Sequence, residues 1–284
     1  MKNLLKSLFI SLFPLLALYA IIISCFHLFT QNFNYVYLGT LITALPIVFF
    51  FSNLFIKPVA RTDAHPKAYT FLISLGFITS IISNGILYQD FSDAFLAISL
   101  FLGWVLYLKW YSIFSGRKTN HELKIGTFLP NLEFEDSEKN KVMTSSFKGN
   151  PAIFLFYRGN WCPLCMAQIK EISDQYRELK KRNVSVIFIS PQPHTYIKKL
   201  ANKFSLEFTF LRDVNNNSSR RLNIVSKNGI PFGFQVLGYN NDTVMPTVII
   251  TDRNGKIIFA DQTDNYRVRP EPETFIKILD TFIG

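Results

Sequence analysis

Cysteine is scarce in this chain, and its scarcity excludes a disulfide-stapled fold. The 284 residues contain three cysteines, too few for the multiple bridges of a small secreted scaffold. Cys25 lies within an apolar run, where a thiol behaves as a small hydrophobic group. Cys162 and Cys165 instead form a Cys-x-x-Cys pair. This pair is therefore the first candidate for chemistry.

Charged residues are scarce over the first 115 residues. This part has six Lys or Arg and three Asp or Glu, whereas the remainder has 24 and 17. Of the formal charge of +10, the first 115 residues carry +3 and the remainder carries +7. Neither part carries a dense basic stripe interleaved with aromatic residues, which argues against nucleic-acid binding. A basic domain next to an anionic lipid surface accounts for the charge more simply.

Four apolar runs in the first part are long enough to cross a membrane. They cover residues 7–29, 35–56, 69–88 and 91–114. A hydrocarbon core about 30 Å thick needs about 20 helical residues. A cleaved signal peptide is the alternative for the first run, but the apolar stretch continues past the candidate cleavage site to Phe29. The sequence thus predicts an all-α four-helix transmembrane bundle over residues 1–115.

The distribution of Lys and Arg predicts the orientation of this bundle. Basic residues precede the first run, occupy the loop 57–67 and follow the fourth run, whereas the other two loops are neutral or acidic. The positive-inside rule then places the N-terminus and the second half in the cytoplasm. We expect a multi-pass protein of a plasma or inner membrane. No Asp, Glu, Lys or Arg lies mid-span, so the predicted role is anchoring rather than transport, with quinone or lipid binding left open.

After a basic linker at residues 116–124, residues 125–284 alternate strand and helix patterns, which is typical of an α/β layer fold. The strand and hairpin patterns comprise residues 151–157, 184–190, 208–211, 247–251 and 256–260. Apolar residues at helical spacing predict helices over 166–179 and 271–282. We find no internal repeat.

The cysteine pair falls where the first predicted strand turns into a helix. Pro163 suits the first helical position, because its missing N–H would have no partner there. Cys162 then lies at the helix start, where the free N–H groups and the helix dipole favour a thiolate. Arg158 could add positive charge if it points inward. Cys165, one turn further on, is close enough to resolve a mixed disulfide on Cys162.

A metal or haem site at the cysteine pair finds less support in the sequence. Structural zinc needs four ligands, and neither a second cysteine pair nor a paired spacing of His121 and His194 is present. Covalent haem requires a histidine after the second cysteine, where Met166 stands. We therefore expect no metal and no cofactor. A merely structural cysteine pair remains the plain alternative.

Three segments in order resemble a known family. Residues 156–165, 245–257 and 264–272 are similar to peroxiredoxin-like proteins of the AhpC/TSA redoxin family, in the branch with a thioredoxin-style Cys-x-x-Cys. The resemblance covers about residues 123–284. It implies a thioredoxin-like fold, with a central mixed sheet flanked by helices, and thiol-dependent antioxidant or oxidoreductase activity. It also implies that Trp161 flanks the sulfurs and that Pro246 forms a cis-proline turn beside them.

The chain departs from the peroxiredoxin pattern at the site. Peroxiredoxins carry Pro-x-x-x-Thr-x-x-Cys and an activating arginine elsewhere. If Cys165 matches their reactive cysteine, Cys162 takes the threonine position and Arg158 the proline position. Arg220 or Arg221 could supply the guanidinium, or each could be a solvated helix charge. A polar network is expected among Asp264, Tyr266, Arg267, Arg269 and Glu271, without assigned roles.

These observations predict a membrane-anchored thiol–disulfide oxidoreductase or thiol-dependent peroxidase. Cys162 attacks a hydroperoxide or a protein disulfide, and Cys165 resolves the product. A cytoplasmic thiol reductant such as a thioredoxin system would regenerate the pair. The alternative is a non-enzymatic redox-sensing or assembly subunit of a membrane complex, with the cysteines as a switch.

Overall fold

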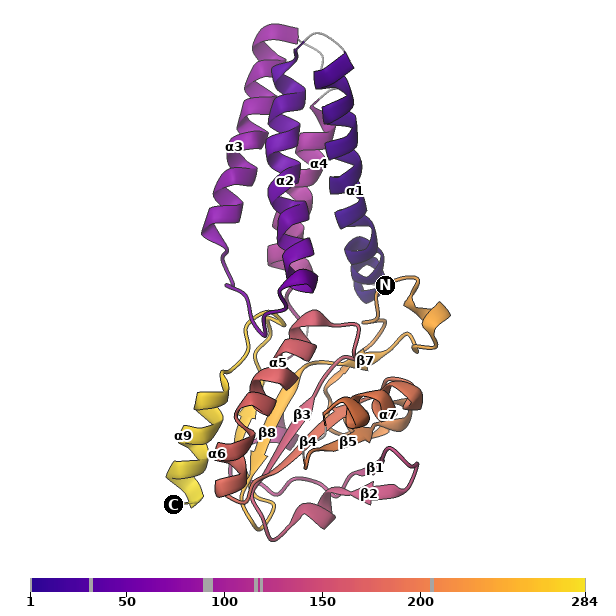
Figure 1. Cartoon of the computed structure of the whole chain (residues 1–284), viewed down its shortest axis with the longest axis vertical. Coiled ribbons are helices and arrows are strands. Elements are labelled where there is room, and N and C mark those ends of the chain that lie inside the picture. Colours follow the sequence, from indigo (N-terminus) through magenta and orange to yellow (C-terminus); the bar gives the residue numbers. More distant parts are fainter. Residues whose placement is uncertain are drawn as a thin grey trace.

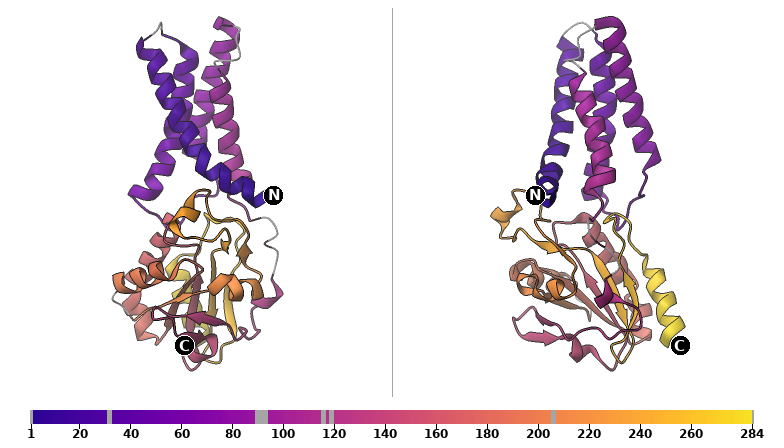
Figure 2. Two further views of the ribbon diagram at one scale, coloured as in Figure 1. Left: turned by 90° about the vertical axis from the view of Figure 1, so that its right-hand side faces the viewer. Right: turned by 180° about the vertical axis from the view of Figure 1, so that it is seen from behind.

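The computed structural model has a helical bundle above an α/β domain (Figure 1). It describes residues 2–30, 33–88, 94–114, 117, 120–204 and 207–283. The N-terminus, the α2–α3 loop and the end of α4 all lie at the end of the bundle that meets the domain (Figures 1 and 2).

Four helices of the described residues form the bundle: α1 (Lys2–Thr30), α2 (Tyr35–Ile56), α3 (Lys67–Ser83) and α4 (Phe95–Leu106). The third and fourth continue as π-helical turns at Asn84–Tyr88 and Tyr107–Tyr111. Three stretches, Asn3–Thr30, Tyr35–Ile56 and Lys67–Ile86, are long and apolar enough to cross a membrane. The fourth, Phe95–Tyr111, is shorter; residues 91–93 of the predicted fourth run lie outside the described residues.

Small residues let α2 and α3 approach closely. A Cβ atom on Gly39 would lie 2.4 Å from the backbone nitrogen of Ser80, and one on Gly76 would lie 2.5 Å from that of Thr43. Close packing of small residues is a common way for apolar helices to associate in lipid, where no hydrophobic effect drives them together. The side chains of Thr40 and Ser80 lie 3.5 Å apart at the same contact.

The α/β domain is built on a mixed sheet of seven strands in the order β2-β1-β5-β4-β3-β8-β9. Strands β3, β4 and β5 are parallel, whereas β8 pairs antiparallel with both β3 and β9. The strands of this sheet are β1 (Glu133–Glu135), β2 (Lys141–Met143), β3 (Ala152–Phe156), β4 (Ser185–Ser190), β5 (Thr209–Arg212), β8 (Thr247–Thr251) and β9 (Ile257–Asp261). A separate short pair joins β6 (Val225–Ser226) to β7 (Thr243–Val244).

Helices flank this sheet and carry the site. They are α5 (Pro163–Asp174), α6 (Tyr176–Lys181), α7 (His194–Lys203), α8 (Asn217–Arg221) and α9 (Pro272–Ile283). The prediction of a thioredoxin-like mixed sheet flanked by helices is confirmed. The single helix predicted over 166–179 is interrupted at Gln175, where φ −90° and ψ 10° leave the helical region.

One apolar cluster runs from the bundle into the domain. Ile153 and Leu155 of β3 pack with Ile169 of α5 on one face of the sheet, and the same cluster continues to Phe51 and Trp104 of the bundle. The opposite face of the sheet has a second core, which includes Phe154 and Phe156. The bundle and the cysteine-bearing face therefore share buried surface.

Backbone and side-chain bonds also join the two parts. Ser7 Oγ donates to the carbonyl of Ile230 at 2.6 Å, and Phe232 N donates to the carbonyl of Ser7 at 3.3 Å. After α4, Phe114 N donates to the carbonyl of Asp264 at 2.7 Å. Helix α1 begins before the predicted residue 7, and its first turns lie against the domain.

A fully buried arginine completes this junction. Arg267 Nη1 donates to the carbonyl of Asp63 at 2.7 Å, and its Nη2 donates to that of Ala64 at 3.0 Å. Its Nε donates to Ser112 Oγ at 2.9 Å. The predicted linker is attached as well, since Arg117 donates to the carbonyl of Pro246 at 2.8 Å.

Candidate active site

The cysteine pair lies where β3 turns into α5, at the end of the domain that faces the bundle (Figure 1). Cys162 is the N-cap of α5 and Pro163 takes the first turn, as predicted. The turn requires Gly159, whose φ of +149° and close contact with Trp161 leave no room for a side chain. The carbonyl of Cys162 accepts hydrogen bonds from Cys165 N at 3.0 Å and Met166 N at 3.1 Å, and the second of these is the first α-helical bond of α5.

Both cysteines are free and buried. Cys162 is 3% exposed and Cys165 is 0% exposed. Each thiol shifts the pKa of the other, so the two lie near one another at the start of α5. Cys25 is half-buried in α1, in the half of the helix that points away from the domain (Figure 1).

Arg269 lies directly against the pair. Its Nη1 and Nη2 are 3.6 and 3.5 Å from Cys165 Sγ, and its Nη2 is 3.9 Å from Cys162 Sγ. Nη1 also donates to Gln168 Oε1 at 2.9 Å, and Nε donates to the carbonyl of Tyr266 at 3.0 Å. These bonds fix a buried guanidinium beside both sulfurs.

This arrangement places the negative charge on Cys165 rather than on Cys162. Burial alone would raise the pKa of Cys165, but the hydrogen bond from Cys162 and the charge of Arg269 lower it to about 5. Burial raises the pKa of Cys162 well above its ordinary value, and its hydrogen bond to Cys165 adds to that rise. The predicted thiolate at Cys162 is therefore wrong for the resting pair, because the guanidinium lies nearer to Cys165.

Arg158 and Trp161 line the same cavity as Cys162. Arg158 is buried and points inward, with its guanidinium 4.6 Å from the centre of the Trp161 ring. It donates to the carbonyl of Gly229, and its charge opposes the rise in the Cys162 pKa that burial and Cys165 cause. Trp161 in turn packs edge-on against Phe234 at a ring distance of 5.8 Å.

The structure corrects the expectation for Pro246. The described residues contain no cis peptide bond, and the bond before Pro246 is trans. Pro246 separates β7 from β8, and Met245 N donates to the carbonyl of Ile224 at 2.7 Å. The trans form is the intrinsically favoured one, and the residue serves as a proline at the start of a strand.

An apolar cavity of about 330 Å³ opens onto Cys162. Residues of α1 and α2 form one wall, and Trp161, Cys162 and Pro163 lie on the other. Cys165 is absent from its lining. Cys162 is therefore the sulfur that a molecule in this cavity would meet.

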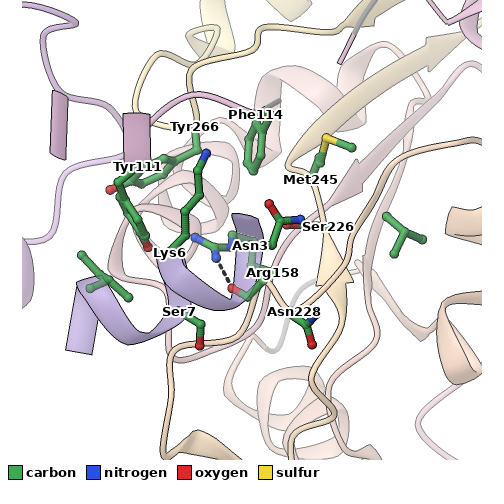
Figure 3. A pocket seen from close by; sticks show the side chains of 13 residues that line it. Asn3, Lys6, Ser7, Tyr111, Phe114, Arg158, Ser226, Asn228, Met245 and Tyr266 are labelled. Atoms are coloured by element: carbon green, nitrogen blue, oxygen red, sulfur yellow. Dashed lines mark hydrogen bonds between the residues drawn. The ribbon is translucent and has the colours of Figure 1, made fainter. Parts of the chain in front are cut away.

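A smaller polar cavity of about 60 Å³ adjoins the first, and both are lined by Ile10, Tyr111, Arg158 and Tyr266. Figure 3 shows Lys6 and Arg158 there together with Ser7, Ser226 and Asn228. Within the described part of the chain, neither cation forms an ion pair with a carboxylate. Their charges add to the positive potential around the sulfurs.

The loop between α2 and α3 contacts the backbone of Arg269. Arg61, in the loop between α2 and α3, donates through Nε to the carbonyl of Arg269 at 3.1 Å. Its Nη2 lies 2.5 Å from Glu171 Oε2 on α5. The loop thus holds the segment that carries Arg269 and the helix that carries Cys165 in one arrangement.

The sequence pattern suggested two other arginines for the guanidinium. Arg220 and Arg221 are exposed, and Arg221 donates to the carbonyl of Asn131 at 2.8 Å. They are solvated helix charges, the second of the two alternatives. Arg269 was expected only as part of a polar network, since nothing in its spacing from the cysteines indicates contact. Among the described residues no group of three or more His, Cys, Asp or Glu could hold a metal ion.

Residues 125–260 match the model of the AhpC/TSA family. Chloroplastic peroxiredoxin Q of Triticum aestivum is 33% identical over 101 residues, 36% of this chain and 46% of that protein. Peroxiredoxin Bcp of Escherichia coli (strain K12) is 26% identical over 147 residues, 51% of this chain and 90% of that protein. The crystal structure of peroxidoxin BcpB from Mycobacterium tuberculosis has a TM-score of 0.47 at 16% identity and covers 57% of this chain and 99% of that one.

The chain spans about half the length of the chloroplastic relatives it matches. The family match covers the cysteine pair and most of the sheet, but it leaves out the helical bundle and Arg269. Residues 125–260 are therefore similar to the AhpC/TSA family and to peroxiredoxins of the Q and Bcp types.

Proposed function

We propose that this chain is a membrane-anchored thiol peroxidase that reduces hydroperoxides with the Cys162–Cys165 dithiol. The observation that carries the proposal is the contact of Arg269 with both sulfurs at the start of α5. A dithiol with a pKa of about 5 at one member holds a single negative charge at neutral pH. The similarity of residues 125–260 to peroxiredoxins supports the same chemistry.

The reaction uses the two sulfurs in turn. The proton that Cys162 shares with the Cys165 thiolate moves to Cys165, and the Cys162 thiolate beside Arg158 and Arg269 attacks the terminal peroxide oxygen. The O–O bond breaks, the alkoxide takes the proton from Cys165, and Cys162 becomes a sulfenic acid. The Cys165 thiolate then attacks Cys162, and hydroxide leaves as water after taking a proton from solvent. One hydroperoxide is reduced to an alcohol and water, and the dithiol is oxidised to a disulfide.

A thiol reductant restores the dithiol by exchange. A small dithiol or a thioredoxin-type protein would attack the sulfur of Cys162, because this sulfur adjoins a cavity and Cys165 does not. Both electrons then pass to the disulfide, and the reductant's own sulfurs are left as a disulfide. No metal or organic cofactor enters this cycle.

The bundle supports the membrane part of the proposal. Three of its helices have the length and composition of membrane spans. Lys2 and Lys6, the basic loop 57–67 and the domain lie at one end of the bundle, which the positive-inside rule assigns to the cytoplasm. We propose a multi-pass arrangement with α4 as the fourth span and the domain in the cytoplasm.

The test is peroxide consumption by the full-length protein in nanodiscs with a chemical dithiol as reductant. Hydrogen peroxide should be consumed over many turnovers, and Cys162→Ser should abolish the reaction. Reduction of insulin disulfides, measured in parallel, tests the disulfide reductase alternative. Absence of turnover in both assays, with the thiols shown to be reduced, would reject an enzyme and favour a redox-sensing subunit.

A further inference from the structure

One wall of the cavity at Cys162 is formed by helices α1 and α2 of the bundle. Ile10, Ser11 and Pro14 of α1 line it together with Phe51, Ser52, Leu54 and Phe55 of α2. Phe55 is 66% exposed, so the cavity wall continues into the apolar outer surface of the bundle. In a membrane this surface meets acyl chains.

A second apolar segment borders the same cavity from the domain. Pro231 and Phe234 line it, and the neighbouring Phe232, Val236 and Leu237 expose 58%, 87% and 54% of their surface. This segment lies beside the N-terminal end of α1, to which it bonds through Phe232 and Ser11 (Figures 1 and 2). Three exposed large apolar side chains next to a membrane helix form a surface suited to lipid.

We infer that this cavity is the substrate site for hydroperoxides carried on long hydrocarbon chains, which enter from the bilayer past the exposed Phe55 of α2. The inference rests on the proposed peroxidase function and adds the substrate class and the route. The chain lies against the apolar walls, and its hydroperoxide group meets Cys162 at the inner end. There the O–O bond is cleaved as described above, and the lipid leaves as an alcohol.

Polar groups at the inner end fit a hydroperoxide. Arg158 Nε and Trp161 Nε1 are buried N–H donors with no partner among the described residues. Both side chains line the cavity beside Cys162. Peroxide oxygens accept hydrogen bonds, so a hydroperoxide at this end could use donors that a plain hydrocarbon would leave unsatisfied.

Ser52→Phe tests the inference by filling the cavity from the side of the bundle. Ser52 lines the cavity on α2 and lies outside the catalytic groups. Thr79→Phe on α3 is the matched control, since Thr79 lines none of the cavities described and its hydroxyl bonds to Leu75 of its own helix. Both variants are measured as full-length protein in nanodiscs.

The substrates are hydrogen peroxide, a fatty-acid hydroperoxide and a phosphatidylcholine hydroperoxide built into the nanodisc. Ser52→Phe should lower kcat/KM for the lipid hydroperoxides about tenfold or more, because an added ring in a packed site is strongly disfavoured. The ratio of kcat/KM for the lipid hydroperoxides to kcat/KM for hydrogen peroxide should fall several-fold in Ser52→Phe, whereas Thr79→Phe should leave this ratio unchanged. Comparison of the two lipids shows whether a free or an esterified chain is the source.

Each other outcome overturns the inference. If Ser52→Phe lowered kcat/KM equally for all peroxides, or did not lower it for the lipid hydroperoxides, the cavity would not select hydrocarbon chains. Wild-type activity with hydrogen peroxide alone would leave the proposed function intact and reject the lipid route. Oxidation of the dithiol by a short-chain ubiquinone, with no lipid hydroperoxide turnover, would assign the cavity to a quinone. Inactivity with every peroxide would instead reject the proposed function itself.

Discussion

Arg269 Nη2 lies 3.5 Å from Cys165 Sγ, inside the protein and 104 residues further along the chain. The guanidinium is buried, so little water screens its charge from the sulfur. A thiolate is the nucleophilic form of cysteine, and a neighbouring cation stabilises it. The reactivity of the cysteine pair therefore depends on the segment after β9 that carries Arg269. Arg61 of the bundle holds this segment by a hydrogen bond to the carbonyl of Arg269.

Arg269→Met should raise the pKa of the dithiol toward that of an ordinary cysteine, near 8.5. The thiolate would then fall to a few per cent at pH 7, and peroxide reduction should slow by about tenfold or more. Thiolate absorbance at 240 nm, recorded across pH, measures the shift directly. Arg269→Lys keeps a positive charge, so the pKa of its dithiol should lie between those of the wild type and of Arg269→Met.

Arg221→Met is the matched control for this change. Arg221 also donates to a backbone carbonyl, but it is exposed and belongs to α8. Its loss should leave both the titration and the rate unchanged. An unshifted thiol titration in Arg269→Met would contradict the electrostatic role of Arg269, whatever happens to the rate.

The pH dependence follows from the lowered pKa of Cys165, about 5. A lowered pKa means that the singly charged pair exists above this value and is lost as the pH falls through it. Single-turnover oxidation by hydrogen peroxide should therefore be nearly constant between pH 6 and 8 and should decline below pH 5. Stopped-flow Trp fluorescence would record it. A rate that rises steadily up to pH 9 would indicate an unperturbed thiol.

The order of attack can be read from the two serine variants. Cys165→Ser should still form a sulfenic acid on Cys162, which dimedone traps and mass spectrometry locates, but it should form no disulfide. Cys162→Ser should form no adduct, because Cys165 is fully buried and lines neither of the two cavities at the site. The reverse pattern, with an adduct on Cys165 alone, would make Cys165 the attacking sulfur.

Much of the site could be predicted from local sequence. The apolar run over 151–157 and Pro163 after Cys162 place the pair at a strand-to-helix turn, and the structure has it there. Local patterns of this kind depend on neighbouring residues alone, so they survive folding. The apolar runs likewise predicted where the helices of the bundle lie to within a few residues.

The groups that set the charge of the pair come from elsewhere in the chain. Arg269 reaches Cys165 only because β8, β9 and α9 fold back beside α5, and no local pattern encodes that return. The predicted position of the thiolate was wrong for the same reason, since it followed the helix start and ignored a cation distant in sequence. The contact of α1 and α2 with the site also escaped prediction, because the resemblance stops at the domain.

Arg267→Met should weaken the junction between the bundle and the domain. Its buried side chain donates to Thr62, Asp63, Ala64 and Ser112, and the loss of these bonds leaves acceptors without a donor. Hydrogen bonds to charged groups contribute about 1.5–3 kcal/mol each, so we expect a loss of roughly 3 kcal/mol or more in unfolding free energy. Arg182→Met is the control, because Arg182 pairs with Asp280 at the surface and such pairs contribute at most about 1 kcal/mol. Thermal unfolding in detergent compares the two variants, and equal small shifts in Tm would show that Arg267 does not hold the junction together.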